Sequence, residues 1–276
     1  MPEFDYHGVS VTYDHAGSGD PILFLHNLGG DRHIWRNQMR DLAGSHSVYA
    51  LDLFGYGDSD TPATGYTVEN YLRMVSEFID AHRLTNLIMV GNCFGSAMSL
   101  LYARREPRNV RALVLCNPLT AATLAPTLTG RTARVAAHLP LDALTRAIRL
   151  PGLAAGFVVR EQLGPRGRHM DGATFAGLRR RWSEPSRLLP PAATTRDLST
   201  LAVLDDFRPG PSFPPVTTIW GAKNRVLSAA AGDRLNRTLC PAQAIELPDC
   251  GHLVMLEEPE TVTTAIRSAT RTALAG

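Results

Sequence analysis

Cys93 is the residue whose neighbours most clearly indicate chemistry. It stands in the stretch GNCFG (91–95), between an apolar run at 86–91 that predicts a strand and a helical pattern. A strand, a turn of the form G-x-nucleophile-x-G and a helix make a nucleophile elbow, which exposes the central side chain at the top of a sheet. The positive end of the following helix favours a thiolate there. The pattern therefore predicts that Cys93 is a nucleophile.

The elements that must position this turn are predicted as alternating strands and helices. Apolar runs predict strands at 8–14, 21–26, 47–52, 86–91, 110–116, 216–221 and 244–247. A 3.6-residue periodicity predicts helices at 68–83, 93–105 and 259–274. Continuous apolar strands separated by helices indicate an α/β fold with a mostly parallel sheet covered on both faces.

Residues 118–200 have a different character, with no strand pattern and several short helical patterns broken by Pro and Gly. They hold twelve Arg, no Lys and five acidic residues, a formal net charge of +7, whereas the whole chain carries +2. We predict a helical insertion between two strands of the sheet. Its charge would suit an anionic substrate, a phosphopantetheine arm or an acidic carrier protein, although solvated helix faces are the simpler explanation.

Composition excludes several other classes of protein. The chain has 276 residues, 44% hydrophobic, which excludes a disordered tail and a disulfide miniprotein. The net charge gives no general attraction to nucleic acid, and no apolar run is long enough to span a membrane. The N-terminal residues lack a signal-peptide pattern, and the four cysteines lack metal-ligand spacing. We expect a cytoplasmic protein without cofactor or metal, of unknown oligomeric state.

With the elbow, four further segments make the chain resemble the α/β-hydrolase superfamily over nearly its whole length. They are LFLHNLGGDRHIW (23–35), DLFGYGDSD (52–60), WGAKNRV (220–226) and LPDCGHLVMLEEPE (247–260). The resemblance implies a core of residues 1–117 and 201–276, with 118–200 as a lid that shapes substrate choice. It also implies that His252 is the catalytic histidine and that the backbone N–H groups of Leu28 and Phe94 form the oxyanion hole.

The chain departs from the family pattern at three places. Cys93 replaces the usual Ser, and Asn224 stands where the triad acid is expected, while the alternative acid position is also an amide, Asn117. In the oxyanion loop, Asn27 replaces a Gly. A thiol ionises more readily than a hydroxyl, with a reference pKa of ~8.5, so it needs less help from a carboxylate. A histidine steadied by an Asn carbonyl oxygen suffices in papain-like enzymes, so Cys93, His252 and Asn224 form a consistent set.

Other interpretations of these residues remain open. Cys93 as a buried filler and Asn224 as a lost acid would leave a binding protein. Asp249, three residues before His252, is near enough in sequence to assist it, although a role in the loop is the simpler interpretation. Asn27, Asn117 and Trp182 are candidates for binding substrate.

We therefore hold three functional hypotheses. The first is an enzyme that hydrolyses or transfers a small-molecule or carrier-bound acyl group, ester or thioester, through Cys93 with His252 as base. The second is a cofactor-free lyase, eliminase or cyclase in which His252 is a lone general base, similar to hydrolase-like enzymes of natural-product biosynthesis. The third is a non-catalytic ligand-binding protein on the same scaffold. The sequence does not identify the substrate.

Overall fold

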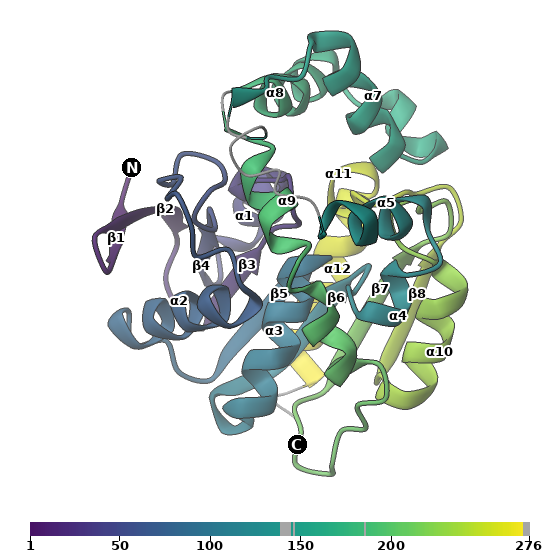
Figure 1. Ribbon diagram of the computed structural model, residues 1–276. Helices are drawn as coiled ribbons and strands as arrows, with labels where there is room; N and C mark the ends of the chain where they lie inside the picture. The colour runs from purple at the N-terminus through teal and green to yellow at the C-terminus, as the bar shows by residue number, and fades with distance from the viewer. Residues whose placement is uncertain (139–144, 146, 185, 273–276) are drawn as a thin grey trace.

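The computed structural model describes residues 1–138, 145, 147–184 and 186–272, and it is built around one eight-stranded sheet (Figure 1). The strand order is β1-β2-β4-β3-β5-β6-β7-β8. Neighbours from β4 to β8 pair in parallel, while β1 and β2 pair antiparallel at one edge. The strands are β1 (Glu3–Tyr6), β2 (Val9–Ala16), β3 (Pro21–Leu25), β4 (Ser47–Leu51), β5 (Leu87–Asn92), β6 (Val110–Cys116), β7 (Val216–Gly221) and β8 (Gln243–Leu247).

Helices cover both faces of the sheet because its central strands are apolar on both sides. In β3, Leu23 and Leu25 join one buried cluster, and the alternating residues Ile22 and Phe24 join the other. The first cluster packs against α2 (Val68–Ala81), α3 (Phe94–Arg105) and α10 (Ala229–Leu239). The second packs against α1 (Arg36–Leu42), α11 (Val254–Glu257) and α12 (Pro259–Thr272).

The stretch between β6 and β7 is helical and contains no strand among its described residues. Figure 1 shows α7 and α8 at the top of the molecule, above α5 and α9. This stretch consists of α4 (Ala121–Leu124), α5 (Leu128–Ala136), α7 (Gly152–Gln162), η3 (Pro165–His169), α8 (Gly172–Ser183), α9 (Leu189–Thr194) and η4 (Leu198–Leu204). Within it, residues 139–144, 146 and 185 lie outside the described part.

The sequence prediction of a mostly parallel α/β sheet is confirmed, and each of the seven predicted strands is present. The predicted helices at 68–83 and 93–105 are also present, and the one at 259–274 is present up to residue 272, beyond which the chain is outside the described part. β1, α1 and α10 were missed because they are short or polar on most of their surface. No helix among the described residues is long and apolar enough to cross a membrane.

Candidate active site

Cys93 occupies the sharp turn between β5 and α3, as the elbow pattern predicts. Its backbone has φ 52° and ψ −110°, a conformation that non-glycine residues rarely adopt. Its N–H donates to the carbonyl of Cys116 on β6 at 2.9 Å, which fastens the turn to the neighbouring strand. The flanking glycines permit close packing: a Cβ on Gly95 would lie 2.1 Å from the carbonyl oxygen of Leu25, and one on Gly91 would lie 2.3 Å from Gly95. Neither position 91 nor position 95 therefore has room for a side chain, and only glycine fits at both.

The sulfur of Cys93 lies against the two backbone N–H groups that the resemblance assigns to the oxyanion hole. The side chain is buried, and this burial raises the pKa of the thiol to about 12. Hydrogen bonds from the N–H groups of Phe94 and Leu28 act in the opposite direction but are the smaller effect. The two donors converge where a carbonyl oxygen attached to Cys93 would develop negative charge.

His252 is held by its main chain in a tightly braced loop. Its N–H donates to the carbonyl of Gln162 at 2.6 Å, and its own carbonyl accepts from the Asn117 amide at 3.1 Å. The buried carboxylate of Glu257 accepts the N–H groups of Gly251 at 2.6 Å, Gly164 at 2.6 Å and Gly167 at 3.0 Å. These bonds join the histidine loop to the end of α7 and the start of η3.

Asn224 contacts the His252 ring, but through its amide nitrogen. The Asn224 side-chain oxygen accepts the backbone N–H groups of Val226 at 2.9 Å and Leu227 at 3.0 Å. Its NH₂ group must then face His252 Nδ1, which lies 3.1 Å away. Because an amide NH₂ only donates, Nδ1 must accept and the ring proton must sit on Nε2. The prediction that the Asn224 carbonyl oxygen accepts a hydrogen bond from His252 is therefore wrong. Instead, the Asn224 NH₂ group donates to the ring.

Both Cys93 and His252 are neutral in this arrangement. Burial lowers the pKa of His252 to about 3, so the imidazole carries no charge at neutral pH. Among the described residues no hydrogen bond joins the Cys93 sulfur to the His252 ring, although both line one pocket. A preformed thiolate–imidazolium pair is thus absent from the described contacts.

The other amide candidates brace the site in different ways. Asn117 is buried with φ 44°, and its oxygen accepts the Gly221 N–H at 3.0 Å while its NH₂ bonds the main chain of His252. It therefore positions the histidine loop and does not line the pocket. Asn27 lines the pocket and donates to the Gln162 side chain at 3.2 Å, which joins the oxyanion loop to α7.

A cavity of about 670 Å³ opens above Cys93 and His252. Its wall is mainly apolar and is formed by α4, α5, α7, α8 and α9 together with the loop after β7; Leu119, Leu124, Leu128, Phe157, Trp182, Val226 and Leu227 contribute side chains. Trp182 also packs on the oxyanion loop, since a Cβ on Gly29 would lie 2.1 Å from its ring. The cavity suits a substrate with a sizeable apolar part.

Two residues of the site had no recognisable role in the sequence. Glu257 was missed because its partners are backbone N–H groups, two of them about ninety positions away. Gln162 was missed because a single Gln in a helical pattern carries no signal. Asp249 is exposed. His26 has a structural role, because its ring donates to the Asn27 carbonyl at 2.7 Å and accepts from the Leu53 N–H at 3.0 Å. No group of His, Cys, Asp or Glu within the described residues is arranged to hold a metal ion.

Comparisons with known proteins identify the family to which this fold belongs. A family model described as alpha/beta hydrolase fold matches residues 20–259. A 2-hydroxy-6-oxo-2,4-heptadienoate hydrolase of Pseudomonas putida is 28% identical over 91% of this chain and 89% of its own length. A haloalkane dehalogenase of Agrobacterium fabrum is 38% identical, but the match covers 41% of this chain and only 37% of the dehalogenase.

Solved structures show the same fold at low identity. An esterase from Thermogutta terrifontis superposes with a TM-score of 0.81 at 21% identity, covering 98% of this chain and 97% of the esterase. An enol-lactonase from Burkholderia xenovorans gives a TM-score of 0.79 at 20% identity, covering 98% and 100%. The family model spans most of the chain, and it includes the elbow, the oxyanion loop and the histidine loop. The chain therefore belongs to the α/β-hydrolase fold family of enzymes.

Proposed function

We propose that this protein acts on an ester or thioester whose acyl group lies in the apolar cavity, and that Cys93 is the nucleophile. The observation that carries the proposal is the position of the thiol: it lies at the bottom of the cavity, against the N–H groups of Phe94 and Leu28. A carbonyl attacked by this sulfur would place its oxygen on the same two donors. The helices of 118–200 act as the lid in this proposal, because they supply most of the cavity wall.

In the covalent step the sulfur–carbon bond forms while the Cys93 proton moves to Nε2 of His252. The same proton then goes to the departing sulfur or oxygen, and the acyl group remains on Cys93 until water or a second nucleophile removes it. For Nε2 to accept, the ring must first move its resting proton to Nδ1, opposite the NH₂ of Asn224. Two donors then face each other, at a cost of about 1–3 kcal/mol. A thiol tolerates this weak base better than a hydroxyl would.

A test of this route uses a phosphate-free acyl thioester, the octanoyl thioester of N-acetylcysteamine. Intact-mass analysis should show one added acyl group, and peptide mapping should place it on Cys93. Cys93→Ala should remove the adduct and the turnover while the fold is retained. A Cys93 peptide that stays unmodified while the enzyme turns over would reject the covalent route.

A second candidate function rests on the direction of the hydrogen bond from Asn224 to His252. In the resting tautomer His252 presents an Nε2–H donor on the edge of the ring away from Asn224, and Cys93 stays a neutral thiol. Together with the Leu28 and Phe94 N–H groups, this donor would stabilise an enolate or another oxyanion without covalent attachment, as a lyase or cyclase requires. Retained turnover in Cys93→Ala would support this candidate.

A further inference from the structure

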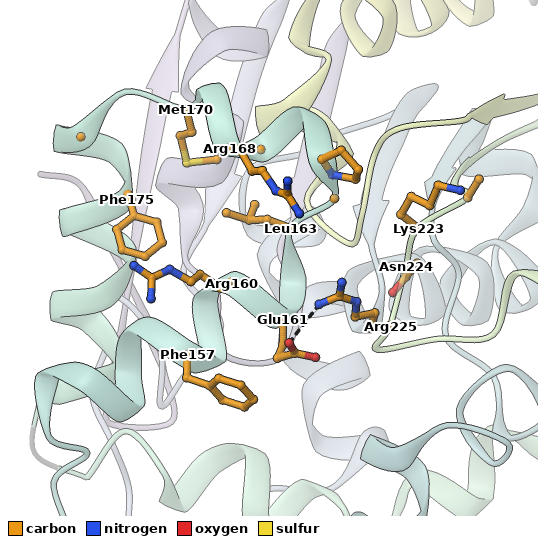
Figure 2. A pocket seen from close by; sticks show the side chains of 15 residues that line it. Phe157, Arg160, Glu161, Leu163, Arg168, Met170, Phe175, Lys223, Asn224 and Arg225 are labelled. Carbon is orange, nitrogen blue, oxygen red and sulfur yellow. Dashed lines mark hydrogen bonds and ion pairs between the residues drawn. The ribbon is translucent and has the colours of Figure 1, made fainter.

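A second cavity, of about 910 Å³, lies beside the active-site cavity. Figure 2 shows the side chains that line this second cavity. Its walls come from α7, η3, the start of α8 and the loop that carries Asn224. Three residues, Phe157, Glu161 and Arg225, line both cavities. The two spaces are therefore adjacent, and the boundary between them is formed by α7 and the loop that carries Asn224.

The second cavity is strongly basic. Among the described lining residues, Arg160, Arg168, Lys223 and Arg225 are cationic, and Glu161 supplies the only carboxylate. Glu161 pairs with Arg225 at 3.0 Å, which leaves the other three cations without a carboxylate of the lining (Figure 2). The described contacts contain no ion pair for Arg168 or Lys223, which are exposed and have donors free to bind an anion.

The remaining walls are apolar. Leu163, Met170 and Phe175 lie on the side of Arg168 and Arg160, and the Arg160 guanidinium stacks over the Phe175 ring at 5.4 Å (Figure 2). Arg and Lys are the side chains that bind phosphate in proteins. A basic space with apolar walls suits a ligand that joins phosphate groups to an uncharged organic chain. The neighbouring apolar cavity would then hold the far end of that ligand.

We propose that the basic cavity binds the phosphate of a thioester carrier of the phosphopantetheine type, whose acyl group lies in the neighbouring cavity above Cys93. The inference rests on the proposed acyl chemistry, because it names the carrier of the acyl group. Lys223 precedes Asn224 and Arg225 follows it. A phosphate bound by these cations thus sits next to the loop that orients His252. The ion pair between Glu161 and Arg225 competes with the phosphate for Arg225.

The test is calorimetric titration of the whole protein with three probes. Pantetheine 4′-phosphate represents a carrier arm, adenosine 3′,5′-bisphosphate represents the nucleotide end of coenzyme A, and pantetheine is the phosphate-free reference. We expect at least one phosphate probe to bind roughly tenfold more tightly than pantetheine, and its affinity to fall with added salt. The phosphate probe that binds shows whether the phosphate belongs to a carrier arm or to the nucleotide end of coenzyme A. Equal affinity for all three probes would overturn the proposal.

Charge variants locate the site. Arg168→Gln with Lys223→Gln should weaken phosphate binding by roughly tenfold, the equivalent of about 1.4 kcal/mol. Glu161→Gln should strengthen it, because it frees Arg225, and a gain in affinity cannot come from misfolding. Arg180→Gln on the exposed surface of α8, outside the cavity lining, is the matched control. An equal loss in Arg180→Gln would show nonspecific attraction and reject the site.

The same variants separate this inference from the proposed function. If the phosphate-free thioester fails to acylate Cys93 while phosphate binding and its loss in the double variant persist, the covalent step is rejected and the basic site stands. If Cys93 is acylated normally and no phosphate probe binds, the acyl chemistry stands and the basic site is rejected.

Discussion

The amide nitrogen of Asn224 lies 3.1 Å from Nδ1 of His252, and the amide oxygen is occupied by two backbone N–H groups of its own loop. A carboxylate at this position would accept from the loop with one oxygen and from the ring with the other. The amide retains the first interaction and reverses the second. The position of the histidine proton thus depends on one side-chain atom of residue 224.

Asn224→Asp should convert His252 into a base. The carboxylate would accept a hydrogen bond from Nδ1–H, so that the ring proton sits on Nδ1 and Nε2 is left free to act as a base. Its negative charge would also raise the pKa of His252 from its value of about 3. If catalysis is covalent, acylation of Cys93 should accelerate by roughly 10²–10⁴, by analogy with the loss seen when a triad Asp becomes Asn. Stopped-flow measurement with an activated acyl thioester gives this rate.

The same substitution has the opposite result if His252 works as a neutral donor. Asn224→Asp would then remove the Nε2–H donor, and turnover of the natural reaction would fall. Asn224→Ala is the matched control, because it removes the amide without adding charge. A natural reaction that Asn224→Asp leaves unchanged would show that the His252 tautomer plays no part in it.

The thiol of Cys93 should react slowly with alkylating agents near neutral pH. Burial raises its pKa to about 12, and only the thiolate is nucleophilic. We expect the rate of modification by iodoacetamide to rise about tenfold per pH unit from pH 7 to pH 10, without a plateau. Peptide mass mapping resolves Cys93 from the exposed Cys240 in one sample. A plateau near pH 7 would instead show a stable thiolate.

The protein should lose stability as the pH falls below neutral. His252 has a pKa of about 3 in the folded state and an ordinary pKa of 6.5 when unfolded, so between these values only the unfolded chain binds the proton. The contribution of the neutral His252 to the free energy of unfolding is fully present above pH 6.5. It is lost as the pH falls toward 3, with a slope of up to about 1.4 kcal/mol per pH unit.

Urea denaturation of the wild type and His252→Gln between pH 4.5 and 7.5 measures this contribution. The variant should show a smaller dependence of the unfolding free energy on pH. Burial also lowers the pKa of His26, and this effect is present in both proteins, so it cancels in the comparison. Equal pH dependence in the two proteins would show that His252 is protonated without unfolding.

Glu257→Gln should destabilise the histidine loop. Both carboxylate oxygens accept backbone N–H groups, and an amide would place its own NH₂ against one of these donors. We expect a loss of about 1–3 kcal/mol in the free energy of unfolding, together with faster hydrogen exchange at residues 249–252. Glu258→Gln, which removes an ion pair with the exposed Arg166, is the control and should cost less than about 1 kcal/mol.

The sequence predicted the parts of the site that depend on local spacing. The glycines at 91 and 95 indicated a tight elbow, and the structure shows that each approaches backbone too closely to carry a side chain. The seven predicted strands are present because buried parallel strands have continuous apolar sequences. Both the elbow and the strands are determined by residues that are close together in the sequence.

Features that depend on distant partners were not predictable. The polarity of the Asn224–His252 contact follows from which backbone N–H groups reach the Asn oxygen, and residue type alone does not specify this. Asn117 was a candidate for substrate contact, yet the fold turns both of its polar atoms toward main chain. The basic cavity needs α7, η3 and the loop after β7 to meet, although the excess of Arg in 118–200 indicated its charge.

The turn at Asn224 also has a genetic consequence. Val226 and Leu227 bind a side-chain oxygen that Asn and Asp share, so the loop can fold in the same way with either residue. Codons for Asn and Asp differ by a single base, as do codons for Cys and Ser. Two single-base changes would therefore convert the set Cys93, His252 and Asn224 into Ser, His and Asp, and the hydrogen bonds of the turn at residue 224 allow either residue there.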